Sequence, residues 1–129
     1  MKREKLISVL IPCYNEEKTV GRVVSDFKKV LPEAVIYVFD NNSSDGSVKV
    51  AQKANATIKT VKYQGKGNVV REMFRTVDSD VYIMVDADNT YDASDAKKMV
   101  DMVINGGVDM TAAGIQFKGV VGDEKTITS

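Results

Sequence analysis

The 129-residue chain contains no histidine and a single cysteine, Cys13. Without histidine, it cannot build a Ser-His-Asp or Cys-His catalytic group, a histidine-ligated zinc site, or an imidazole acid or base. One cysteine cannot form an internal disulfide, and no Cys-x-x-Cys pair is present, which favours a reducing, cytoplasmic setting. We therefore expect that any bound metal is held by carboxylates, and this favours Mg²⁺ or Mn²⁺.

Net charge and long apolar runs are also lacking. Lys plus Arg and Asp plus Glu each number 18, so no overall field draws the chain to nucleic acid or to an anionic membrane. No stretch approaches the ~18 apolar residues of a membrane-spanning helix. The apolar run before Pro12 is too short for a signal peptide and is followed by acids. The composition predicts one domain, in the cytoplasm.

Short runs rich in Val, Ile and Tyr alternate with longer segments in which apolar residues recur at helical spacing. The short runs predict strands over 6–11, 34–40, 56–63, 80–86 and 108–113. The longer segments predict helices around the apolar stripes at 20–31, 69–77 and 96–103, the last ending at 105–107, and a weaker helix over 46–54. Ser44 or Asp45 is placed to cap that weaker helix. The alternation predicts an α/β fold with a mainly parallel sheet and helices on both faces.

Polar loops follow each of the first four predicted strands: PCYNEE (12–17), DNNSSDGS (40–47), YQGKGN (63–68) and DADNTYD (86–92). Each alone has a structural explanation, as a turn, a helix cap or an acidic first helical turn. In open α/β sheets, however, ligands bind outside the carboxyl ends of the strands. The coincidence of these loops at one edge of the sheet favours a binding site.

Asp86 and Asp88 are two residues apart, so in an extended segment both carboxylates project from the same side. Mg²⁺ or Mn²⁺ usually takes one or two protein carboxylates and completes its shell with water and substrate phosphate oxygens. Lys66 and Arg71 would meet phosphate charge, while Gly65 would let the backbone approach it closely. Neither a P-loop nor a G-x-G-x-x-G motif is present. The pattern predicts a metal-assisted site for a diphosphate.

The segments IPCYNEE, DNNSSDGS, GKGNVVR and DAD, in this order and spacing, resemble the donor half of family 2 glycosyltransferases. The resemblance covers about 6–113 and is nearest to the polyprenyl- or dolichyl-phosphate sugar transferases. It implies a Rossmann-like GT-A fold and transfer of a sugar from a UDP- or GDP-linked donor, with a divalent metal on the D-x-D motif. The acceptor implied is one such as polyprenyl phosphate, which would place the protein in the cytoplasm and peripheral to the membrane. The resemblance also implies a nucleotide-sugar-binding domain over 1–115, followed at 116–129 by a tail that is either disordered or cut short.

The resemblance assigns roles by position. Asp40 corresponds to the acid that reads the base, and in D-x-D the last acid ligates the metal while the first contacts ribose or metal-bound water. The metal ligands implied are Asp86 and Asp88. The residues implied to bind the nucleotide sugar are Pro12, Tyr14, Asn15, Glu16, Asp40, Gly65, Lys66, Arg71, Asp86 and Ala87. Cys13 stands where the family often has a small residue, and we interpret it as a packing residue rather than a nucleophile.

No catalytic base is identified from the sequence, since Asp123 and Glu124 lie in the unpatterned tail. Two alternatives remain open at this point. One is a non-catalytic module that only binds the donor. The other is a Mg²⁺-binding receiver-type signalling domain, which has a similar length and acids at its strand ends, although the third predicted strand ends in VKYQGK where such a domain needs a phosphorylatable Asp.

Overall fold

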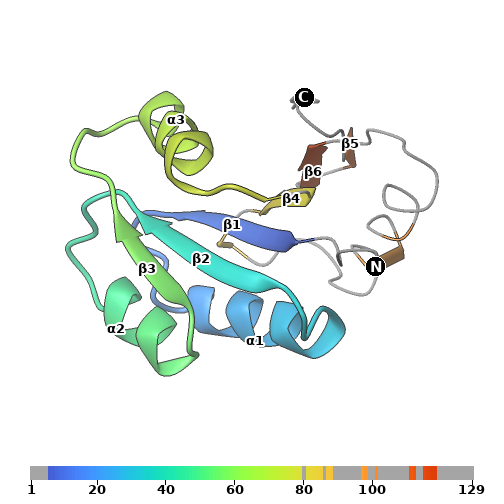
Figure 1. The fold of residues 1–129 in the computed structure, drawn as a ribbon. Coiled ribbons are helices and arrows are strands. Elements are labelled where there is room, and N and C mark those ends of the chain that lie inside the picture. The colour runs from blue at the N-terminus through green and yellow to red at the C-terminus, as the bar shows by residue number, and fades with distance from the viewer. Residues whose placement is uncertain are drawn as a thin grey trace.

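The computed structural model describes residues 6–79, 81–85, 87–88, 97–98, 101, 111–112 and 115–118. Helices and strands alternate as the sequence predicts (Figure 1): β1 (Ile7–Cys13), α1 (Val20–Val30), β2 (Val35–Asp40), α2 (Ser47–Lys53), β3 (Thr57–Thr60), α3 (Lys66–Thr76), β4 (Val81–Val85), β5 (Thr111–Ala112) and β6 (Ile115–Lys118). Residues 97–98 and 101 are helical, in agreement with the stripe at 96–103. The expected end of that helix at 105–107 lies outside the described residues.

The strands form one sheet in the order β3-β2-β1-β4-β6-β5. The first four strands are parallel to one another, which confirms the predicted mainly parallel sheet. β6 runs antiparallel to β4, with Val85 opposite Ile115, and β5 runs antiparallel to β6. The sequence did not predict β6, and the expected boundary at 115 falls inside it. Four residues are too few to show a period, so this strand is defined by its pairing with β4 rather than by its own pattern.

Both faces of the sheet are covered, as predicted. Alternate residues of β1 point to opposite sides of the sheet. Val9 and Ile11 pack in the cluster between the sheet and helices α1 and α2, while Leu10 packs in the cluster between the sheet and α3. Figure 1 shows α1 and α2 below the sheet and α3 above it. All three β1 residues are fully buried, which explains the uninterrupted apolar run in the sequence. Among the described residues, no helix has the length and apolar character needed to cross a membrane.

The strand order reverses beside β1. The chain goes outward from β1 to β2 and β3, and then returns to place β4 on the other side of β1. A ligand in such a sheet binds in the crevice outside the carboxyl ends of the two strands at this switch point. The order also excludes a receiver-type domain, because in that fold β1 lies between β2 and β3, whereas here it lies between β2 and β4.

Candidate functional site

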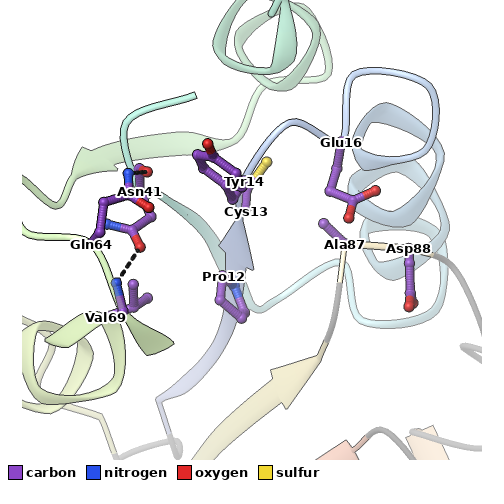
Figure 2. A pocket seen from close by; sticks show the side chains of 10 residues that line it. Pro12, Cys13, Tyr14, Glu16, Asn41, Gln64, Val69, Ala87 and Asp88 are labelled. Carbon is purple, nitrogen blue, oxygen red and sulfur yellow. Dashed lines mark hydrogen bonds between the residues drawn. The ribbon is translucent and has the colours of Figure 1, made fainter. Parts of the chain in front are cut away.

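A cavity of about 440 Å³ opens at this switch point, outside the carboxyl ends of β1, β2 and β4. Its lining comes from the loops that the sequence singled out and from Val69 of α3 (Figure 2): Pro12, Cys13, Tyr14, Glu16, Asn41, Gln64, Gly65, Val69, Ala87 and Asp88. Six of these were predicted to bind the nucleotide sugar or the metal: Pro12, Tyr14, Glu16, Gly65, Ala87 and Asp88. These six residues come from three of the four polar loops. The fourth loop contributes Asn41, which was not among the predicted site residues.

The cavity has two chemically different sides. Figure 2 shows Glu16 and Asp88 on one side, which we call the carboxylate side, and Asn41 and Gln64 on the other, which we call the amide side. Tyr14 lies between them with 51% of its surface exposed. This division would suit a ligand with two parts: an anionic group that reaches the carboxylates through a bound cation, and a planar group that hydrogen-bonds to the amides.

The carboxylate side is fixed at the beginning of α1. The backbone N–H of Glu16 donates to Ser47 Oγ at 2.8 Å, and its carbonyl accepts the N–H of Val20 at 2.9 Å. Ser47 is itself fully buried at the start of α2. Glu16 is thus held by two helices while its side chain lines the cavity.

The amide side depends on Asn41, which is only 5% exposed. Its Nδ2 donates to the carbonyls of Val61 at 3.1 Å and Tyr63 at 2.8 Å, and its Oδ1 accepts the N–H of Gly65 at 3.1 Å. Its own backbone N–H donates to the carbonyl of Cys13 at 2.8 Å. One side chain therefore fixes the course of the 61–65 loop beside the end of β1.

Gly65 lets this loop turn into α3. Its φ is +122°, a region that favours glycine, and its carbonyl accepts the N–H groups of Asn68 at 3.1 Å and Val69 at 3.2 Å. Gln64 donates from Nε2 to the carbonyl of Asn41 at 2.8 Å, which closes the loop onto the end of β2. The backbone around Gly65 thereby forms one wall of the cavity.

Asn15 was expected in the site, but it does not line the cavity. It adopts a left-handed conformation, with a φ of 52°, and its Oδ1 accepts the N–H groups of Ser44 at 2.8 Å and Asp45 at 3.3 Å. Its backbone N–H donates to Ser43 Oγ. Asn15 therefore holds the β2–α2 loop. In the same loop Asp45 accepts the N–H of Ser47, but Gly46 is the N-cap of α2 and no side chain caps this helix, so the capping role predicted for Ser44 or Asp45 is wrong.

Asp40 also lies outside the lining. It is 3% exposed, and its Oδ2 accepts the N–H of Ser43 at 3.0 Å, while Oδ1 is buried with no hydrogen-bond partner among the described residues. Arg71 is exposed on α3 and does not line the cavity. Lys66 begins α3, and its side chain is outside what the structure describes, as is Asp86. The roles expected for these four residues stay predictions.

Cys13 packs in the core cluster beneath α1 and α2, and it also contributes to the cavity wall. Burial raises the pKa of its thiol from 9.0 to about 11, against the opposing effect of a hydrogen bond with Ser47 and with a further increase from the negative charge of Asp40. The thiol is therefore neutral at physiological pH and a poor nucleophile. This confirms the packing role predicted for it.

Sequence reasoning missed Asn41 and Gln64 as cavity residues. Both lie in loops that the sequence had singled out, and Asn41 directly follows Asp40. What was missing is the side on which each side chain lies, since the loop conformation decides this and no periodicity reveals it.

The donor set on the carboxylate side suits a hard divalent cation. Glu16 and Asp88 offer only oxygen atoms, which Mg²⁺ and Mn²⁺ prefer. Among the residues that the structure describes, no group of three or more Asp, Glu, Cys or His side chains could hold an ion. A cation here would therefore need further oxygens from water or from a ligand, as is usual for Mg²⁺ bound with phosphates.

Comparison with known proteins decides the family. The protein-family model described as Glycosyl transferase family 2 matches residues 8–129 of the chain. The chain belongs to this family. The family 2 resemblance of the four loops and the GT-A fold expected from it are thus confirmed.

Relatives of this family 2 chain differ in length. It is 52% identical to the protein RfbJ of Shigella flexneri over 113 residues, which is 88% of either chain. It is 28% identical to the dolichyl-phosphate hexose transferase of Haloferax volcanii over 113 residues, which covers 88% of this chain and 49% of that protein. The glucosyl-3-phosphoglycerate synthase of Mycobacterium tuberculosis, solved with Mn²⁺, UDP-glucose and phosphoglyceric acid, has the same fold with a TM-score of 0.72 and 21% identity, covering 81% of this chain and 42% of that one. The chain thus spans most of RfbJ but less than half of the other two proteins.

Proposed function

We propose that the chain binds a UDP- or GDP-linked sugar in the 440 Å³ cavity and forms the donor-binding part of a metal-dependent glycosyltransferase. The observation that carries this proposal is the position of the cavity at the β1–β4 switch point, with carboxylates on one side and amides on the other. Family 2 membership provides the reaction class, which is transfer of a sugar from a nucleotide donor.

The amide side matches the nucleoside. Gln64 and Gly65 line this wall of the cavity next to Tyr14, whose exposed ring is available to contact a base or ribose. Asn41 shapes this wall, since it holds the loop in place. A planar base between these groups would be oriented by hydrogen bonds and by ring contact.

The carboxylate side matches the diphosphate through a cation. Glu16 and Asp88, with Asp86 as the sequence predicts, would hold Mg²⁺ or Mn²⁺ together with phosphate oxygens. The ion would supply charge stabilisation for the nucleoside diphosphate as it leaves the sugar. The Mn²⁺ and UDP-glucose bound to the mycobacterial synthase support this choice of metal and donor.

The acceptor is proposed from a relative rather than from the cavity. The name of the Haloferax volcanii transferase supports a polyprenyl-type phosphate, which would bring the protein to a membrane surface. Within the described residues, the cavity supports the proposal of donor binding. Transfer to the acceptor is inferred from family membership. The alternative is a donor-binding module without activity, and an activity assay distinguishes the two.

The test is thermal unfolding with UDP, GDP or ADP, in Mn²⁺ and in EDTA. A ligand at about 100 times its Kd should add about 2.7 kcal/mol of stability, and we expect this only when metal is present. Asp88→Asn should abolish the metal-dependent part. Asp26→Asn, a matched change on the solvent side of α1, should not. If the nucleotide stabilised the wild-type protein equally in EDTA, or stabilised the Asp88→Asn variant as much as the wild type, the proposed site would be contradicted.

An activity assay separates the two forms of the proposal. Radiolabelled UDP- and GDP-sugars with Mn²⁺ and a polyprenyl phosphate mixture would show label entering the lipid phase if the chain is catalytically complete. Donor binding without turnover would identify the chain as a donor-binding module.

A further inference from the structure

Thr19 occupies the N-cap of α1, yet its side chain makes no capping hydrogen bond. A threonine at this position normally accepts an N–H of the first helical turn through its hydroxyl oxygen, and this stabilises the helix. Here the hydroxyl donates instead to the carbonyl of Ala87 at 2.5 Å, although the two residues are 68 positions apart in the chain. The local capping role is therefore replaced by a tertiary contact.

This contact joins the two loops of the carboxylate side. The N–H of Thr19 donates to the carbonyl of Glu16 at 3.2 Å, and its hydroxyl also lies 3.4 Å from Glu16 Oε2. Ala87 is buried in the turn that follows β4, directly before Asp88. Thr19 is thus bonded both to the loop that carries Glu16 and to the turn that carries Asp88.

We propose that Thr19 is a positioning residue, whose hydroxyl holds the carbonyl of Ala87 so that Asp88 and Glu16 stay on the same side of the cavity. The link to metal and diphosphate rests on the proposed function. Without the hydroxyl, the turn after β4 loses a hydrogen bond that fixes its orientation. A ligand that needs both carboxylates must then order this turn when it binds, and the free-energy cost of that ordering lowers its affinity.

The first test needs no ligand. Thr19→Val removes the hydroxyl and keeps the shape, Thr19→Ser keeps the hydroxyl, and Thr76→Val is the control because Thr76 donates to the carbonyl of Glu72 within α3, away from the cavity. Hydrogen exchange of the peptide covering 81–92 in metal-free protein should be about fivefold faster in Thr19→Val than in wild type. Exchange in Thr19→Ser and Thr76→Val should match wild type in this peptide.

The second test uses UDP or GDP, whichever stabilises the wild type. The Mn²⁺ concentration for half-maximal binding should rise at least fivefold in Thr19→Val and recover in Thr19→Ser. Affinity for the corresponding nucleoside without metal should not change, because it does not use the carboxylate side. A purely structural role would weaken both kinds of binding.

Two results would overturn the inference: wild-type exchange rates over 81–92 in Thr19→Val, or equally faster exchange in β1 and β2, which would show general destabilisation. If the wild type binds no nucleoside diphosphate in Mn²⁺, the proposed function fails. The exchange result then decides alone whether Thr19 holds the turn.

Discussion

Asn41 offers the sharpest test of how the cavity is built, because a single buried side chain fixes a whole loop. Asn41→Ala removes the donors to the carbonyls of Val61 and Tyr63 and the acceptor for the N–H of Gly65. The backbone hydrogen bond of residue 41 to Cys13 is unaffected by the substitution. The change is therefore limited to three side-chain hydrogen bonds and a small void.

The expected cost follows from the surroundings of these partners. A net hydrogen bond contributes about 0.5–1.5 kcal/mol, and a buried group left without a partner costs about 1–3 kcal/mol. Val61 is buried, at 3% exposed, so its carbonyl bears the larger cost, while Tyr63 is 74% exposed and water can replace the lost donor there. We expect a loss of about 2–4 kcal/mol in the free energy of unfolding.

Urea unfolding followed by far-ultraviolet circular dichroism would measure this loss. Asn68→Ala is the matched control, since it removes one exposed side-chain bond to the carbonyl of Gln64 in the same loop and should cost less than about 1 kcal/mol. The nucleotide affinity of Asn41→Ala should also fall, because the amide side loses its shape. A variant with wild-type stability and affinity would refute the conclusion that Asn41 builds this side of the cavity.

Two further predictions concern Cys13 and the glycines of the 61–68 segment. At pH 8 the Cys13 thiol of the native protein should react with a disulfide reagent far more slowly than the same thiol in urea. Because folding raises the pKa of this thiol to about 11, the contribution of the neutral thiol to stability should be complete below about pH 9 and be lost as the pH rises toward 11. Rapid native labelling would contradict this. Gly65→Ala should destabilise the fold by about 1 kcal/mol or more because of its φ of +122°, whereas Gly67→Ala, in α3 with no atom within 4 Å of the added Cβ, should be neutral or stabilising by up to ~1 kcal/mol. Equal effects of the two substitutions in urea unfolding would refute this explanation.

The order of elements and the location of the site could be predicted from the sequence. Helical and strand periodicities are local properties of the chain, so β1 to β4 and α1 to α3 were each predicted to within a few residues. The polar loops were placed at one edge of the sheet because consecutive βαβ units put every carboxyl end on the same side. Six of the predicted site residues line the cavity for this reason.

Tertiary structure decided which loop side chains face the cavity. Asn15 and Asn41 are both asparagines at strand ends, and the sequence assigned only Asn15 to the site. The structure turns Asn15 onto the β2–α2 loop through a left-handed backbone and bonds to Ser44, while it turns Asn41 to the cavity through bonds to residues 20 to 24 positions further along. Such partners are set by the packing of distant segments.

The same distinction applies to Thr19 and to β6. Thr19 was not singled out from the sequence, and only the return of β4 beside β1 brings the carbonyl of Ala87 within reach of its hydroxyl. β6 has too few residues to show a period and becomes a strand through pairing with β4. The sequence by itself determined the α/β alternation and the edge of the sheet that carries the site, because both follow from local periodicity. Contacts between distant segments decided the orientation of the side chains and the final antiparallel pairing, because these exist only once the sheet has formed.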